Sequence, residues 1–269
     1  MMKLTRAVED LRAKGRKGVV PFFTAGYPDP ATTLRLVAAA QQAGCEVVEL
    51  GLPFSDPIAD GPAIQASSQK AWAGGMTLNG ALELAAEAAR SGVALVLMGY
   101  VNPLLHMGME RFADRAATAG VAGLILPDVP REESREIRGL LVQRDVAWVD
   151  LVARTTPLER VKVITADAEG FVYLVSVTGV TGTQAPRADE VEEFVERVGC
   201  HTARPLYVGF GVDGPSLARA MTRRADGVII GSALVEVIER AGPAAAPVAV
   251  RTFLDEVQQA VNPTEGSRP

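Results

Sequence analysis

Short apolar runs alternate with longer amphipathic segments along most of this chain. The runs are rich in Val, Ile and Leu and are apolar on both faces, which is typical of buried parallel strands. We predict eight strands, at 18–26, 45–51, 93–100, 121–128, 146–153, 171–177, 205–211 and 226–232. Apolar positions at helical spacing predict helices at 31–43, 78–90, 109–119, 132–143, 157–167, 189–198 and 215–223, and another from about residue 233.

This alternation decides the expected fold. A strand followed by a helix, repeated eight times over about 250 residues, indicates a (β/α)8 TIM barrel. The first residues predict an extra N-terminal helix, and 248–261 predict an extra C-terminal helix. The alternative is an open doubly wound sheet, but no GxGxxG follows the first strand. No Pro/Gly/Ser linker interrupts the middle of the chain, so we expect one domain over 1–262 and a disordered tail over 263–269.

Charge and cysteine content narrow the class of protein. The net charge of −5 argues against a nucleic-acid or anionic-membrane partner. Cys45 and Cys200 form no CxxC pair, which favours a reducing compartment. The N-terminus carries charges throughout and lacks the apolar core of a signal peptide, and the apolar run 93–98 is too short to span a membrane. We therefore expect a cytoplasmic protein.

Three carboxylates lie close together in the stretch CEVVELGLPFSDPIADGPAIQ, at 45–65. Glu49 lies inside an apolar strand, where an unpaired charge is costly to bury. In a barrel of this kind the active site lies at the C-terminal ends of the strands, so Glu49 is a candidate acid–base group. The alternative is a Glu paired with an Arg or a backbone amide. Asp56 and Asp60 follow on a Pro-rich loop, where an Asp often only hydrogen-bonds its own turn.

Glycines follow the last three predicted strands, in TGVTG (178–182), GFG (209–211) and GS (231–232). Glycine allows backbone N–H groups to approach an anion, and the helix that begins near Ser232 adds its positive end. These loops predict a phosphate site, although each glycine could instead serve a tight strand-to-helix turn. No Walker motif occurs in the sequence.

The positions of Lys and His exclude other chemistries. Lysine occurs only at 3, 14, 17, 70 and 162, away from the predicted strand ends, so a Schiff-base enzyme is not expected. Histidine occurs only at 106 and 201, so a His-bound metal is not expected. Cys45 begins its strand, at the wrong end for a nucleophile. Carboxylate acid–base chemistry on a phosphorylated substrate remains.

Six motifs resemble the tryptophan synthase α subunit family, in order and over nearly the whole chain. They are PFFTAGYPD (21–29), ELGLPFSDPIADGPAIQ (49–65), GLILPDVP (123–130), YLVSVTGVTG (173–182), VGFG (208–211) and IIGSALV (229–235). The resemblance implies a (β/α)8 barrel that cleaves indole-3-glycerol phosphate into indole and glyceraldehyde 3-phosphate by a retro-aldol step. It also implies that the chain needs no metal or cofactor, and that pyridoxal phosphate belongs to a β subunit in an α2β2 assembly.

The resemblance assigns roles to residues that match the motifs. Glu49 and Asp60 match the catalytic carboxylates. Substrate-pocket positions are matched by Phe22, Ile64, Leu126, Tyr173 and Thr181, and phosphate-site positions by Gly182, Phe210, Gly211, Gly231 and Ser232. Asp56 matches a position that faces the partner. We expect Pro53 on the same loop, and Asn102 and Pro103 on the loop after the next strand, to join this interface.

Some stretches depart from the family pattern, at Arg154, at Val101 and in the segment 184–186 of an expected lid at 178–188. The alternatives are a free-standing lyase of the same fold, another phosphosugar-acting barrel enzyme such as an isomerase, and a partner-binding subunit whose catalysis has decayed.

Overall fold

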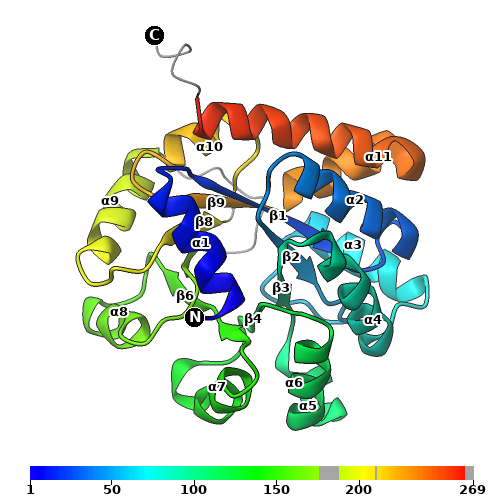
Figure 1. The fold of residues 1–269 in the computed structure, drawn as a ribbon, viewed down its shortest axis with the longest axis horizontal. Helices are drawn as coiled ribbons and strands as arrows, with labels where there is room; N and C mark the ends of the chain where they lie inside the picture. Colours follow the sequence, from blue (N-terminus) through cyan, green and yellow to red (C-terminus); the bar gives the residue numbers. More distant parts are fainter. Residues whose placement is uncertain (176–187, 210, 264–269) are drawn as a thin grey trace.

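Parallel strands form one continuous sheet that curls into a nearly closed barrel with helices outside it (Figure 1). The computed structural model describes residues 1–175, 188–209 and 211–263. The strands in these ranges are β1 (Gly18–Thr24), β2 (Val47–Gly51), β3 (Ala94–Met98), β4 (Gly123–Ile125), β5 (Ala147–Trp148), β6 (Asp150–Ala153), β7 (Val172–Val175), β8 (Leu206–Gly209) and β9 (Gly227–Ile230). Their order is β5-β4-β3-β2-β1-β9-β8-β7-β6. The predicted TIM barrel is confirmed.

The barrel closes through a single interrupted strand. β5 and β6 stand at the two ends of the sheet order, yet only Val149 separates them in the chain. β5 pairs with β4, and β6 pairs with β7. The predicted strand 146–153 therefore exists as two halves, and it joins the two edges of the sheet.

Helices follow most strands, as the apolar spacing predicts. Those expected from the pattern are α2 (Pro30–Gln42), α4 (Leu78–Ala88), α6 (Met109–Thr118), α7 (Arg135–Val142), α8 (Leu158–Thr165), α9 (Ala188–Gly199) and α10 (Pro215–Met221). The short 3-10 turns η1 (Ala89–Ser91) and η2 (Arg131–Glu133) make up parts of the predicted 78–90 and 132–143 helices. The last two predicted helices form one element, α11 (Ser232–Val261), with a kink at Gly242.

Two helices lie where the sequence interpretation placed only loops. These are α3 (Pro62–Ala73) and α5 (Val101–Met107). Within α5, Leu104 faces the core and is 1% exposed. Each of these helices contains one proline in its first turn, and Pro62 begins α3, where the missing N–H has no cost.

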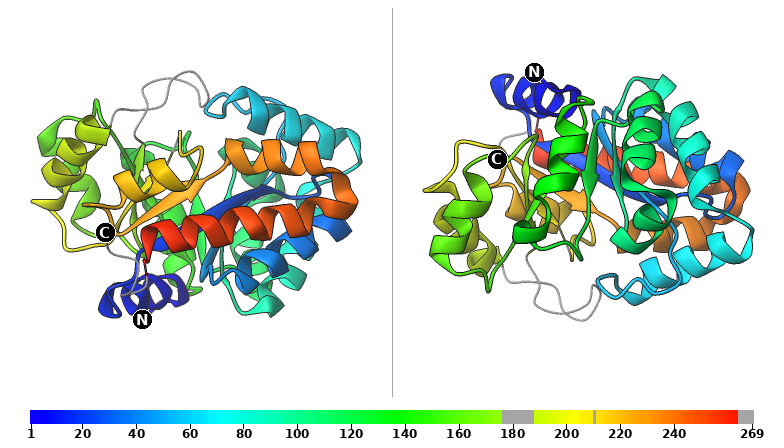
Figure 2. Two further views of the ribbon diagram at one scale, coloured as in Figure 1. Left: turned by 90° about the horizontal axis from the view of Figure 1, so that it is seen from above. Right: turned by 90° about the horizontal axis from the view of Figure 1, so that it is seen from below.

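The core fills the barrel, and α1 (Lys3–Ala13) closes its N-terminal end. All residues of β1, β2 and β3 are buried, which agrees with their apolar sequences. Leu4 of α1 is fully buried and lies directly against Gly123 and Gly170. α1 and α3 lie at opposite ends of the barrel (Figure 2). No helix in the described ranges combines the length and apolarity that a membrane span needs.

Candidate active site

The candidate carboxylates lie where β2 meets its following loop. Glu49 is in register with Phe22 on β1 and with Val96 on β3, so three neighbouring strands fix its height in the barrel. Asp60 lies directly before α3, on the loop that leaves β2. Both side chains are buried, at 1% and 8% exposure. The burial of Asp60 distinguishes it from an ordinary turn Asp. The loop sequence alone does not make this distinction.

Glu49 has a strongly perturbed environment. Neither carboxylate oxygen has a hydrogen-bond partner among the described residues. Burial raises the pKa of Glu49 to about 8, and the negative charge of Asp60 adds to the shift. Glu49 therefore keeps its proton at neutral pH, which also removes the cost of burying a charge. The alternative of a Glu paired with an Arg finds no support in the described part of the chain.

Asp60 is held by a tyrosine that the sequence interpretation missed. Burial raises the pKa of Asp60 to about 6, while a hydrogen bond from the Tyr100 hydroxyl lowers it in part. The same hydroxyl accepts a hydrogen bond from the backbone N–H of Ala59, at 3.0 Å. Its ring stacks on Phe54 at 5.2 Å between centroids. Tyr100 thus joins the end of β3 to the Asp60 loop, a contact between residues forty positions apart.

A small cavity lies beside Asp60. Phe22, Ile64 and Tyr100 line it together with Asp60, so two of the predicted pocket residues meet there. Phe22 fits because Gly51 leaves room for it: a Cβ on Gly51 would lie 2.5 Å from the ring. In the same way the Tyr173 ring occupies the space that a side chain on Gly209 would need.

Two predicted pocket residues lie elsewhere in the mouth. Tyr173 is buried on β7, close enough that the charges of Glu49 and Asp60 raise the pKa of its phenol, after burial itself. Leu126 does not line the Asp60 cavity but a separate one beside β6. Thr181 lies outside the described residues.

Two buried serines of α3 support the Asp60 loop. The Ser68 hydroxyl accepts a hydrogen bond from the Phe54 N–H at 3.0 Å and donates one to the Phe54 carbonyl oxygen at 3.2 Å. Ser67 and Thr24 share a hydrogen bond of 2.6 Å, which ties α3 to the end of β1. No motif in the sequence signals these serines, because their role depends on a helix that the pattern did not predict.

Two of the predicted phosphate residues that the structure describes, Gly231 and Ser232, lie at the start of α11. Gly231 is the N-cap residue, and its Cα faces Ile64 and Phe22. The first N–H groups of a helix have no acceptor within the helix, and the first turn of α11 carries no acidic side chain. Gly211 follows β8 with a φ of 88°, which favours glycine. Gly182 and Phe210 lie outside the described residues.

Comparisons with known proteins decide the family. The family model for the tryptophan synthase alpha chain matches residues 8–262. The chain belongs to the tryptophan synthase alpha chain family. The alpha chain of Laribacter hongkongensis is 43% identical, over 97% of this chain and all of the relative. That of Caldanaerobacter subterraneus is 40% identical, over 89% and 92% of the two chains.

Solved structures support the same assignment. The tryptophan synthase alpha chain of Legionella pneumophila is 32% identical, with a TM-score of 0.90 over the whole of both chains. A chain of Mycobacterium tuberculosis tryptophan synthase is 31% identical, with a TM-score of 0.89 over 98% of this chain and 99% of that one. As a tryptophan synthase alpha chain, the protein is a lyase of tryptophan biosynthesis that cleaves indole-3-glycerol phosphate.

The alpha chain also presents exposed apolar residues near this mouth. Ile58, on the Asp60 loop, is 76% exposed, and Leu105, on α5, is 57% exposed. Asp56, on the same loop as Ile58, is exposed and accepts a hydrogen bond from the Ser55 hydroxyl. Asn102 is exposed and Pro53 and Pro103 are half-buried. Within the described ranges, no group of three or more His, Cys, Asp or Glu could hold a metal ion.

Proposed function

We propose that Glu49 and Asp60 perform the cleavage as a pair with divided tasks. The observation that carries this proposal is the burial of both carboxyl groups at one mouth, which raises the pKa of Glu49 to about 8 and that of Asp60 to about 6. Near pH 7 one carboxyl keeps its proton and the other is ionised. A site with one acid and one anion can serve two parts of one substrate.

The reaction then proceeds without an external electron sink. Glu49 donates its proton to C3 of the indole ring, and positive charge develops at the ring nitrogen. The Asp60 carboxylate stabilises that charge. A carboxylate accepts the proton of the hydroxyl on the adjacent glycerol carbon, the bond between this carbon and C3 breaks, and its electrons return to the ring. The products are indole and glyceraldehyde 3-phosphate, and all atoms of the substrate are retained.

We expect a bell-shaped pH profile for kcat/KM. Activity should rise as Asp60 ionises near pH 6 and fall as Glu49 loses its proton near pH 8. Tyr100→Phe removes the hydrogen bond that lowers the pKa of Asp60, so the acid limb should move to higher pH while the alkaline limb stays. Steady-state rates of indole release across this range provide the test. A Tyr100→Phe profile identical to the parent would contradict the assignment of the acid limb.

We further propose that Gly182, Phe210, Gly211, Gly231 and Ser232 bind the substrate phosphate. The N-terminus of α11, without an acidic side chain in its first turn, supports this proposal. The position of Gly231 beside Ile64 and Phe22 puts that helix end next to the apolar cavity. An indole ring in the cavity and a phosphate at the helix would account for both ends of the substrate.

Gly231→Asp should weaken the binding of glycerol phosphate by about tenfold or more, because a carboxylate would stand at the helix end that attracts the anion. A Cβ at this position would lie 3.1 Å from the Ile64 side chain, so crowding also has to be measured. Gly231→Asn is the matched control, since it adds the same bulk without the charge. Calorimetry of both variants separates the effect of charge from that of crowding. If both variants bound glycerol phosphate as tightly as the parent, the phosphate would bind elsewhere.

We also propose that a tryptophan synthase β subunit docks over this mouth, in an α2β2 assembly in the cytoplasm. Ile58 and Leu105 are exposed, and so is Asp56 on the loop of Ile58, which supports an interface with apolar residues and a charged contact. Pro53 belongs to the loop of Asp56, and Asn102 and Pro103 belong to α5. This chain would need no cofactor of its own, and pyridoxal phosphate would belong to the β subunit.

We propose as well that residues 1–262 form one domain.

Supplying indole-3-glycerol phosphate, with and without a β subunit, tests the whole proposal. Asp56→Ala should fold normally and keep its activity alone, but a β subunit should stimulate it much less than the parent, because the partner would lose its charged contact. Stimulation equal to that of the parent would exclude Asp56 from the communication. A parent chain that no β subunit binds or stimulates would favour the free-standing lyase instead.

A further inference from the structure

The short link between β3 and α5 carries Tyr100, whose hydroxyl holds Asp60. Only Gly99 and Tyr100 separate the end of β3 from Val101, the first residue of α5. The Tyr100 side chain is 4% exposed, and its hydroxyl bonds both Asp60 and the backbone N–H of Ala59. The position of this hydroxyl therefore depends on how the two ends of the link are anchored.

Both anchors come from β4 and the turn that follows it. The N–H of Gly99 donates a hydrogen bond to the Ile125 carbonyl oxygen at 3.1 Å. The N–H of Val101 donates to the Asp128 carboxylate, at 3.2 Å to Oδ1 and 3.0 Å to Oδ2. The first contact joins two backbones and does not depend on a side chain, whereas the second depends on the carboxylate of Asp128.

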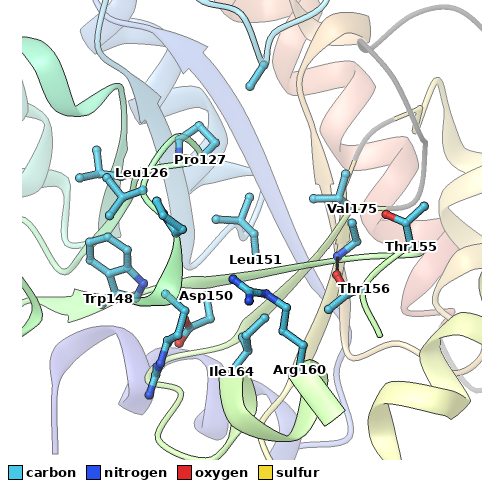
Figure 3. Close-up of a pocket in the computed structure, with 15 residues that line it drawn as sticks. Leu126, Pro127, Trp148, Asp150, Leu151, Thr155, Thr156, Arg160, Ile164 and Val175 are labelled. Atoms are coloured by element: carbon cyan, nitrogen blue, oxygen red, sulfur yellow. Dashed lines mark hydrogen bonds and ion pairs between the residues drawn. The ribbon is translucent and has the colours of Figure 1, made fainter. Parts of the chain in front are cut away.

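A tight turn presents Asp128 to Val101. The N–H of Val129 donates to the Leu126 carbonyl oxygen at 3.3 Å, which closes the turn. Pro127 occupies the second position of this turn, a position that proline favours because its φ is already restricted. Leu126 and Pro127 line the cavity beside β6 (Figure 3). One turn therefore supplies both a wall of the mouth and the acceptor for the start of α5.

Asp128 has no competing partner in the described part of the chain. Its half-buried carboxylate accepts only from the Val101 N–H there and forms no ion pair. Burial raises the pKa of the Tyr100 phenol, and the charges of Asp60 and, to a smaller extent, Asp128 add to this rise, so the carboxylate lies close to the ring. A charged acceptor makes a stronger hydrogen bond to a backbone N–H than a neutral one does, and a negative charge suits the first turn of a helix.

We propose that Asp128 is a positioning residue for the cleavage reaction. It holds the N–H of Val101, so that the Tyr100 hydroxyl stays in place beside Asp60. Without this contact, the backbone after Tyr100 loses its anchor and the hydroxyl can move away from the carboxyl group. The proposal rests on the role proposed above for Asp60, and Asp128 acts through Tyr100 and not on the substrate itself.

Asp128→Ala should move the acid limb of the kcat/KM profile to higher pH, in the same direction as Tyr100→Phe. Asp60 would lose part of the hydrogen bond that lowers its pKa. We also expect kcat near pH 7 to fall by a factor of about 10–100, the size of effect that a small misplacement at a reacting centre has. A profile of folded Asp128→Ala identical to that of the parent would overturn the proposal.

The conservative variant tests whether the hydrogen bond carries the effect. Asp128→Asn keeps a side-chain oxygen that can accept from the Val101 N–H, so it should restore most of the parental rate and pH profile. If Asp128→Asn were as impaired as Asp128→Ala, positioning through this hydrogen bond would be wrong.

A double variant tests whether Asp128 acts through the Tyr100 hydroxyl. In the Tyr100→Phe background, Asp128→Ala should shift the acid limb no further, because the hydroxyl is already absent. A further shift as large as that in the parent background would overturn the proposal. Failure of the proposed function gives a different result: Tyr100→Phe alone would leave the acid limb at its parental pH, which would overturn the role of Asp60 and this proposal with it.

Asp29→Ala is the matched control. The Asp29 carboxylate accepts a hydrogen bond of 2.7 Å from the Thr32 N–H at the start of α2, so it makes a contact of the same kind at another helix. Its loss should lower the midpoint of thermal unfolding, as the loss of Asp128 should, but leave the acid limb unchanged. If Asp29→Ala shifted the acid limb as much as Asp128→Ala, the shift would follow from lost stability and the proposal would be overturned.

Discussion

Glu49→Gln should lower the rate of indole release by a factor of about 10²–10⁴, the usual contribution of general acid–base catalysis. The amide has nearly the shape of the protonated carboxyl but cannot give a proton to C3 of the indole ring. Because Glu49 is buried without a hydrogen bond in the described part of the chain, the substitution breaks no contact, and substrate affinity should stay close to that of the parent. Single-turnover rates and calorimetry measure the two quantities.

A loss of folding would mimic this result, and the pH dependence of the free energy of unfolding tests for it. The pKa of Glu49 in the folded state lies near 8, above the ordinary value of 4.5 for a glutamate, so the folded parent loses stability as pH rises from about 4.5 to about 8. Glu49→Gln has no such loss and should be relatively more stable at high pH. Glu46→Gln, directly before the first residue of the same strand, is the control and should keep its activity. Near-normal turnover of Glu49→Gln would refute the proton-transfer role.

Asp60→Asn should lower kcat by a factor of about 10²–10³, similar to the loss of one charge-stabilising group in other active sites. The positive charge at the indole nitrogen exists only after C3 is protonated, so KM should change much less than kcat. The acid limb of the pH profile should also disappear, because the group that titrates near pH 6 is gone. Steady-state kinetics between pH 5 and 9 gives all three readouts.

The neighbouring Asp56 offers a matched control for this prediction. Asp56→Asn makes the same chemical change on the same loop, but at an exposed position, and should keep the activity of the chain assayed alone. If Asp60→Asn instead raised KM and left kcat unchanged, Asp60 would bind the ground state and not the developing charge. That outcome would leave the fold and the family untouched but would remove Asp60 from the chemical step.

The local pattern was enough for the architecture. Apolar runs on both faces give buried parallel strands, and helical spacing between them leads to a barrel, so the strand positions follow from burial alone. The same pattern distinguishes Glu49, because a charged carboxylate inside an apolar strand is costly to bury unless its pKa rises and it keeps its proton. The ordered motifs indicate the family, since each one occupies a strand end where the barrel places its chemistry.

The tertiary structure decided what depends on contacts between distant segments. Tyr100 lies on the segment after β3, and only folding brings its hydroxyl to Asp60 and Ala59. The helices α3 and α5 pack Ile64 and Leu104 against the core, a contact that the local pattern of the sequence does not indicate. Asp150 lies in a strand whose other residues are apolar, and the arginines that form ion pairs with it, Arg131 and Arg138, belong to η2 and α7. Local sequence encodes burial and periodicity, whereas charge pairing across the barrel depends on which strand ends meet.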